Sequence, residues 1–136
     1  MSTQGYSGTP LPRKLGLKPG MEVAWPTAPD GFLELLGALP DGVRVKRRAV
    51  APLDLTVLFV RRRAALTRRL PALMRAVAPA GAVWVAWPKR ASGVATDVTE
   101  DVVRAVALPL GLVDVKVCAI DATWSALRLV IRRELR

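Results

Sequence analysis

The chain has 136 residues, of which 51% are hydrophobic, and its formal net charge is +10. This length accommodates one domain with a packed core, and the positive charge favours contact with anionic partners. The sequence has no histidine and one cysteine, which excludes histidine-based catalysis, imidazole metal sites and disulfides within the chain.

Apolar spacing and turn residues divide the chain into short helices and strands that largely alternate. In chain order, the expected elements are a helix over residues 9–15, a strand over 21–25, a helix over 30–39, strands over 43–46 and 55–60, a helical stretch over 61–77, a strand over 82–87, a helix over 97–108, and strands over 112–119 and 124–132. Residues 1–8 show no apolar period and predict a flexible tail, which leaves residues 9–136 as a single domain.

Capping residues and one proline predict where the helices begin and end. Thr9, Asp30 and Asp97 each precede an apolar helical pattern and are the expected N-caps. A glutamate three residues after Asp97 completes a capping-box pattern. Pro71 lies inside the long helical stretch, where it would either kink one helix or begin a second one, and we favour a second helix.

The order of the elements predicts an α/β fold in three layers. Alternation favours a mostly parallel sheet of about six strands, whereas the last two strands are joined by only about five residues and must form an antiparallel hairpin. With the strands numbered along the chain, the expected spatial order is 2-1-3-4-6-5, which resembles a minimal, truncated Rossmann-like methyltransferase domain. The link over residues 47–54 is short for a parallel crossover, so an antiparallel second strand is the alternative.

Ligands of open α/β sheets bind beyond the carboxyl ends of the strands, so the residues at this edge form the candidate site. Tryptophans at strand ends suit a stacked ring, and basic residues before a helix suit a small anion. The competing interpretations are tryptophans packed under loops, a solvated basic loop and a simple turn aspartate. The candidate ligand-binding residues are Trp25, Pro26, Thr27, Arg61, Trp87, Lys89, Arg90, Ser92, Gly93, Asp121 and Trp124.

Nucleotide motifs are missing where such a fold would carry them. No Gly-x-Gly-x-x-Gly or Walker sequence occurs, and Arg47 and Arg48 end the second strand, where a carboxylate would hold a ribose. The carboxylates are scattered and form no acid–base pair. We therefore expect no cofactor, no metal and no catalytic residue. The sequence favours a non-enzymatic binding or regulatory domain for an anionic ligand or a protein partner, and it leaves residual methyltransferase activity open.

The positive charge supports a second hypothesis, a nucleic-acid interface. Its candidate residues are Arg61, Arg62, Arg63, Arg68 and Arg69. The alternative is that the charge reflects solubility and an arginine-rich composition. No leader pattern opens the sequence and no apolar run approaches the ~20 residues of a membrane span, so we expect a cytoplasmic protein without membrane contact. The oligomeric state stays open.

Several stretches resemble a family of small bacterial proteins known as a domain of unknown function. They include Trp-Pro-Lys-x-x-Ser-Gly over residues 87–93 and Asp-x-x-Trp-Ser over residues 121–125, together with Gly-Tyr-Ser-Gly-Thr-Pro-Leu over residues 5–11. Arg90 stands where this pattern would have a second lysine, which keeps the charge. The resemblance implies a stand-alone cytosolic domain and supplies no mechanism.

Overall fold

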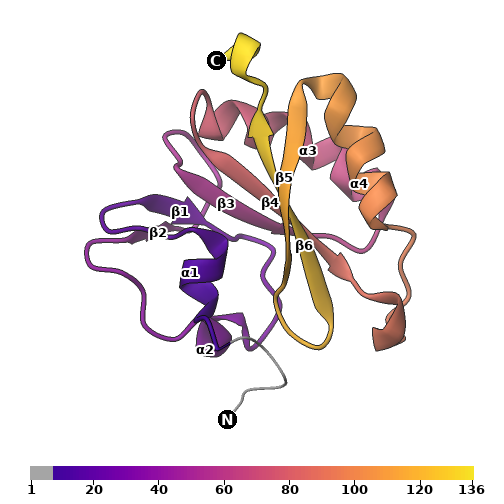
Figure 1. Ribbon diagram of the computed structural model, residues 1–136, viewed down its shortest axis with the longest axis horizontal. Coiled ribbons are helices and arrows are strands. Elements are labelled where there is room, and N and C mark those ends of the chain that lie inside the picture. The colour runs from indigo at the N-terminus through magenta and orange to yellow at the C-terminus, as the bar shows by residue number, and fades with distance from the viewer. Residues whose placement is uncertain (1–7) are drawn as a thin grey trace.

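The computed structural model describes residues 8–136, so most of the predicted flexible tail lies outside the described residues. The strands are β1 (Glu22–Ala24), β2 (Arg44–Lys46), β3 (Leu55–Phe59), β4 (Ala82–Pro88), β5 (Leu112–Ala119) and β6 (Trp124–Ile131). The helices are α1 (Leu11–Leu15), α2 (Phe32–Leu36), α3 (Arg63–Val77) and α4 (Glu100–Ala107), with 3₁₀ turns η1 (Arg90–Ser92), η2 (Leu108–Leu110) and η3 (Arg133–Leu135) (Figure 1).

The six strands form one sheet in the order β2-β1-β3-β4-β6-β5, which confirms the predicted order. β1 pairs in parallel with β2 and β3, β3 pairs in parallel with β4, and β6 runs antiparallel to both of its neighbours. The mostly parallel α/β fold is therefore confirmed, and β2 is not antiparallel. Its short link to β3 suffices because β2 has three residues and spans only about 10 Å.

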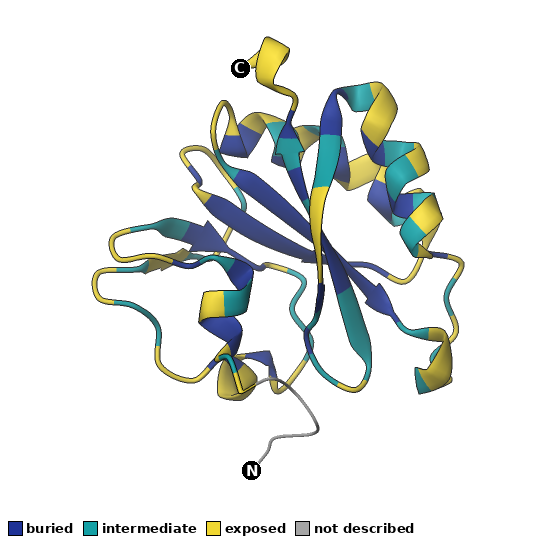
Figure 2. Ribbon diagram, in the orientation of Figure 1, coloured by how far each residue is buried: buried dark blue, intermediate teal, exposed yellow. Residues whose placement is uncertain are grey.

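Helices cover both faces of the sheet (Figure 1). α1 and α2 pack on one face over a core cluster that includes Val23 and Trp84, whereas α3 and α4 pack on the other over a cluster that includes Leu70 and Val103. Figure 2 shows the central strands buried along their length, and every residue of β3 and β4 is buried. Burial on both faces explains why these two strands are almost entirely apolar in sequence. None of the helices within residues 8–136 has the length and apolarity to cross a membrane.

The long helical stretch forms one helix, so the predicted division at Pro71 is wrong. A proline in a helix removes one backbone hydrogen bond and disfavours the preceding turn. The buried face of α3 continues across it, with Leu66 and Leu70 before the proline and Leu73 and Val77 after it. Packing of this continuous face against the sheet outweighs the local cost of the proline.

All three predicted N-caps are wrong. α1 follows Pro10, which makes no side-chain capping bond, so Thr9 is not the cap. α2 follows Gly31 in the left-handed conformation, with φ of 88°, so Asp30 is not the cap. α4 is capped by Thr99, two residues after the predicted Asp97. The sequence patterns place these three N-caps within two residues of the observed ones but do not choose the capping residue.

Candidate functional site

The three strand-end tryptophans lie at one edge of the sheet, as expected, but they lie on both of its faces and so do not form one stacking site. Trp25 belongs to the core cluster beneath α1 and α2, and Trp124 packs against the same cluster. Trp87 belongs to the cluster beneath α3 and α4. Trp25 and Trp87 are each 7% exposed, so neither offers an open face for stacking. Trp84 is fully buried on the opposite face from Trp87, as strand alternation predicts.

Side chains make contacts across the crevice in which open α/β sheets bind ligands. It lies between the carboxyl ends of β1 and β3, where the strand order changes direction. The Thr27 hydroxyl accepts a hydrogen bond from the backbone N–H of Phe59 at 3.0 Å, which ties the β1–α2 loop to the end of β3. Edge-to-face contacts then run from Trp25 through Phe32 and Phe59 to Trp124, with ring centroids 5.0 to 5.5 Å apart.

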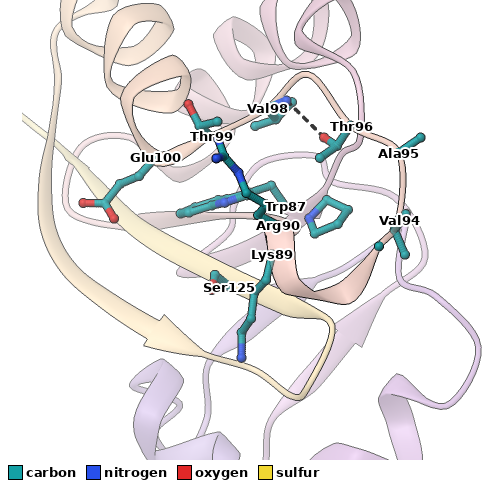
Figure 3. A pocket seen from close by; sticks show the side chains of 12 residues that line it. Trp87, Lys89, Arg90, Val94, Ala95, Thr96, Val98, Thr99, Glu100 and Ser125 are labelled. Carbon is teal, nitrogen blue, oxygen red and sulfur yellow. Dashed lines mark hydrogen bonds between the residues drawn. The ribbon is translucent and has the colours of Figure 1, made fainter.

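A cavity of about 580 Å³ opens beyond the carboxyl end of β4, and we name it the β4-edge pocket (Figure 3). It is lined by Trp87, Pro88, Lys89, Arg90, Gly93, Val94, Ala95, Thr96, Val98, Thr99, Glu100 and Ser125. Its volume lies in the range of roughly 300 to 1,000 Å³ that is typical of small-molecule sites. Four of the predicted ligand residues, Trp87, Lys89, Arg90 and Gly93, therefore meet at one cavity.

Hydrogen bonds within the loop between β4 and α4 shape this pocket. The Ser92 hydroxyl donates to the Lys89 carbonyl at 2.6 Å and accepts from the backbone N–H of Val94 at 3.2 Å, so Ser92 stabilises the turn and does not line the cavity. Gly93 follows with φ of 77°, a conformation that favours glycine. The backbone N–H of Lys89 donates to the Thr123 carbonyl at 2.7 Å, which joins the loop to the β5–β6 turn.

The same loop is fastened to the start of α3 by two side chains. The Asp97 carboxylate accepts a hydrogen bond from the backbone N–H of Arg63 at 2.6 Å, and the Thr96 hydroxyl donates to the Arg61 carbonyl at 2.7 Å. Asp97 therefore caps α3 from a distant segment, whereas Thr99 caps α4. Arg61 contributes its main chain to this junction and does not line the β4-edge pocket.

Two cations dominate the charge of the β4-edge pocket. Figure 3 shows their side chains leaving the loop in opposite directions, Arg90 toward the start of α4 and Lys89 away from it. Glu100 lines the wall, but its carboxylate pairs with Arg104. Arg104 also donates a hydrogen bond to Asp114 at 3.0 Å, which lowers the pKa of that carboxyl. Within residues 8–136 no carboxylate pairs with Lys89 or Arg90.

Three other predicted ligand residues line different cavities. Asp121 and Trp124 line a cavity of about 270 Å³ beside α2 on the opposite face of the sheet. The Asp121 carboxylate accepts hydrogen bonds from the backbone N–H groups of Thr123 and Trp124, both at 2.8 Å, so it stabilises the β5–β6 turn. Pro26 lines a further cavity beside α3. Ligand binding by these residues stays a prediction.

The five arginines predicted to bind nucleic acid separate into two groups. Residues 61–63 lie at the start of α3, whereas Arg68 and Arg69 lie further along it, and all five are exposed. A step of five residues turns a helix by about 500°, so side chains at positions 63 and 68 point about 140° apart. Arg68 and Arg69 instead line a cavity of about 340 Å³ together with Arg47 and Arg48.

Sequence reasoning missed the part of the β4-edge pocket that follows Gly93. The missed lining residues are Val94, Ala95, Thr96, Val98, Thr99, Glu100 and Ser125, with Pro88 at the strand end. The feature that could have indicated these residues is the loop itself, because it joins a basic strand end to the start of a helix. No group of three Cys, Asp or Glu side chains that could hold a metal ion occurs within the described part of the chain.

The fold is that of Rossmann-like methyltransferases. One similar solved structure is a Bordetella parapertussis protein described as a possible exported protein, with a TM-score of 0.62 and 16% identity over 89% of this chain; the chain spans 65% of that protein, just under two thirds of its length. A putative methyltransferase from Thermoplasma acidophilum gives a TM-score of 0.56 and 10% identity over 87% of this chain and 71% of its own. Magnesium protoporphyrin IX methyltransferase from Synechocystis PCC 6803, with bound SAM, gives a TM-score of 0.59 and 9% identity. This match covers 88% of this chain and 73% of that protein.

These identities are low enough that the likeness shows the fold alone. No family model matches the chain, and no curated protein matches its sequence. The resemblance of residues 87–93 and 121–125 to a family of small bacterial proteins therefore stays a prediction.

Proposed function

We propose that this chain is a binding domain of methyltransferase-like fold that holds a small anionic or nucleotide-like ligand in the β4-edge pocket without chemical turnover. The observation that carries the proposal is the combination of a cavity of about 580 Å³ with two cations, Lys89 and Arg90, that no carboxylate within residues 8–136 neutralises. A cavity of this size with a few polar groups suits a small molecule.

The cofactor SAM is the first ligand to consider, because it is bound in one of the structural neighbours. The residues of this chain do not fit it at the crevice between β1 and β3. Trp25, Pro26 and Thr27 replace a glycine-rich turn, and Thr27 is bonded to Phe59 across the crevice. Arg47 follows β2, where a carboxylate would accept hydrogen bonds from the ribose hydroxyls. We therefore derive no methyl transfer for this chain.

The attraction for an anion comes from the side chains of the loop and not from the helix. α4 begins at the wall of the pocket, and its positive end would favour an anion. Glu100 and Asp101, however, lie in its first turn and offset that field. Lys89 and Arg90 therefore carry the attraction, and their opposite directions suit a ligand with negative charge at two places (Figure 3).

Thermal unfolding in the presence of single nucleotides, S-adenosyl compounds and acyl phosphates tests the proposal. We expect at least one ligand to raise the melting temperature by more than about 2 °C. The double variant Lys89→Gln/Arg90→Gln should lose that shift. Ala95→Phe, which fills the pocket without changing the charge, should lose it as well.

The matched control is Lys18→Gln/Arg133→Gln, which removes the same charge from exposed residues outside the pocket. It should keep the ligand shift. A control that loses as much as the pocket variant would overturn the proposal, because the attraction would then depend on net charge alone. A panel without any stabilising ligand would also overturn it and favour a protein partner.

A nucleic-acid interface is the second candidate function, and the exposed arginines at positions 61–63 favour it. These residues are consecutive at the start of α3, and within residues 8–136 no carboxylate side chain pairs with their guanidinium groups. Binding to a DNA or RNA duplex should then fall steeply between about 50 and 200 mM salt. Absence of binding at low salt would exclude this function.

A further inference from the structure

The cavity beside α3 is a second basic site, and we name it the arginine groove. It is defined by Arg47, Arg48, Arg68 and Arg69, with Ala49 and Leu73 among its apolar residues. Its volume is about 340 Å³, and it shares no lining residue with the β4-edge pocket. Binding in this groove is therefore independent of the ligand proposed above.

The groove exists because no helix connects β2 to β3. The connecting segment lies against α3, where the backbone N–H of Leu53 donates to the Ala76 carbonyl at 3.1 Å. The Lys46 ammonium donates to the carbonyls of Pro52 at 2.6 Å and Val50 at 3.3 Å, which holds the segment in a compact turn. The backbone of the segment that carries Arg47 and Arg48 is therefore fixed beside α3, and these two residues line one cavity with the two arginines of the helix.

No carboxylate neutralises the groove. The chain has 11 acidic residues, all within the described range, and none of them pairs with the four arginines. Glu22, on the neighbouring strand β1, pairs with Arg44 and Lys46 instead. Four positive charges thus line one small cavity, and a bound anion would offset their mutual repulsion.

The chemistry of these four side chains favours phosphate groups. A guanidinium donates two parallel hydrogen bonds to phosphate oxygens, which a lysine ammonium cannot do. The arginines come from two elements, so they can contact a ligand from two sides. This arrangement suits several linked phosphates better than one, and Ala49, Ala72 and Leu73 leave an apolar surface beside them.

We propose that the arginine groove binds a linked polyphosphate, either free or as part of a nucleoside di- or triphosphate. A nucleic-acid backbone carries the same phosphates, but along an extended strand that needs a continuous basic track. The start of α3 does not extend the groove, because positions 63 and 68 point about 140° apart around the helix. A compact cluster of four arginines therefore favours the small ligand.

Isothermal titration with inorganic tripolyphosphate at about 100 mM salt tests the proposal. We expect the wild type to bind and Arg48→Gln/Arg69→Gln to bind about tenfold more weakly or worse, since a hydrogen bond to a charged group is lost at each position. The matched control Arg62→Gln/Arg133→Gln removes the same charge from exposed residues outside the groove, and it should stay within about twofold of the wild type. Arg47→Gln/Arg68→Gln serves as the second groove variant if thermal unfolding shows that the first is unfolded.

Further titrations with ATP and a single-stranded RNA oligonucleotide identify the source of the phosphates. ATP that binds about tenfold more tightly than tripolyphosphate indicates a nucleoside ligand, and equal binding indicates free polyphosphate; either result supports the groove. RNA binding without tripolyphosphate binding overturns the proposal, as does equal weakening in the groove and control variants. Lys89→Gln/Arg90→Gln should retain tripolyphosphate binding, which distinguishes this groove from the β4-edge pocket.

Discussion

Replacing Asp97 with alanine tests how the loop of the β4-edge pocket stabilises α3. Its carboxylate accepts a hydrogen bond at 2.6 Å from the backbone N–H of Arg63, the first residue of the helix. α3 has no capping side chain of its own, and arginines occupy its N-terminal end. Because α3 covers the sheet with a continuous buried face, we expect Asp97→Ala to lower the stability of the whole fold.

Two contributions set the size of this effect. Loss of an N-terminal capping bond costs about 1 kcal/mol, and loss of a carboxylate beside the positive end of a helix costs about 0.5 kcal/mol. The free energy of unfolding should therefore fall by about 1.5 kcal/mol, and the melting temperature by about 5 °C. Asp97→Asn keeps a hydrogen-bond acceptor and loses only the charge, so its expected loss is about 0.5 kcal/mol.

Urea unfolding followed by tryptophan fluorescence measures these differences. The control is Glu134→Gln, which removes one negative charge from an exposed residue near the C-terminus and should change the free energy of unfolding by less than about 0.5 kcal/mol. The capping interpretation is refuted if Asp97→Ala is as stable as this control. It is also refuted if Asp97→Asn loses as much stability as Asp97→Ala.

Three further substitutions test other parts of the structure by urea unfolding. Thr99→Ala should cost about 1 kcal/mol, because its hydroxyl accepts from the backbone N–H of Val102 at 3.2 Å, and Thr99→Ser should restore most of it. Gly81→Ala should cost about 2 kcal/mol or more, because the added methyl would lie 2.6 and 2.8 Å from two backbone carbonyl oxygens. Asp114→Asn should cost less than about 1 kcal/mol at neutral pH, because the pair with Arg104 is partly exposed. Arg104 lowers the pKa of Asp114, so the contribution of this pair to the free energy of unfolding depends on pH. The difference in stability between the wild type and Asp114→Asn should be complete above the usual pKa of 3.8 and disappear as the pH falls through the lowered pKa.

The strand order can be predicted from the sequence because connection lengths restrict the topology. The turn between β5 and β6 is too short for a parallel crossover, and the apolar runs of β3 and β4 place these strands at the centre. The continuity of α3 through Pro71 cannot be predicted in this way. The local rule for proline is correct about the lost hydrogen bond, but the packing of Leu70 and Leu73 against the sheet decides the outcome.

The candidate site could be predicted as an edge of the sheet but not as one face of it. Alternation along a single strand correctly places Trp84 and Trp87 on opposite faces. No such rule relates Trp25 to Trp87, because Trp25 follows β1 whereas Trp87 lies on β4, and their faces depend on the register between these strands. Asp97 shows the same limit. Its position in the sequence fits a cap of α4, whereas its carboxylate accepts a hydrogen bond from the backbone N–H of Arg63 in α3, 34 residues away in the chain.

Most acidic residues bond to other groups of the chain, and this explains where the positive charge gathers. Asp54, Asp97 and Asp121 accept hydrogen bonds from backbone N–H groups at strand, helix and turn boundaries. Three more carboxylates pair with Arg104 beside α4. Each of these groups is held in place by a structural role, so none is free to neutralise the arginine groove. An arginine-rich composition accounts for how many arginines the chain has, but it does not account for four of them lining one cavity from which every carboxylate is absent.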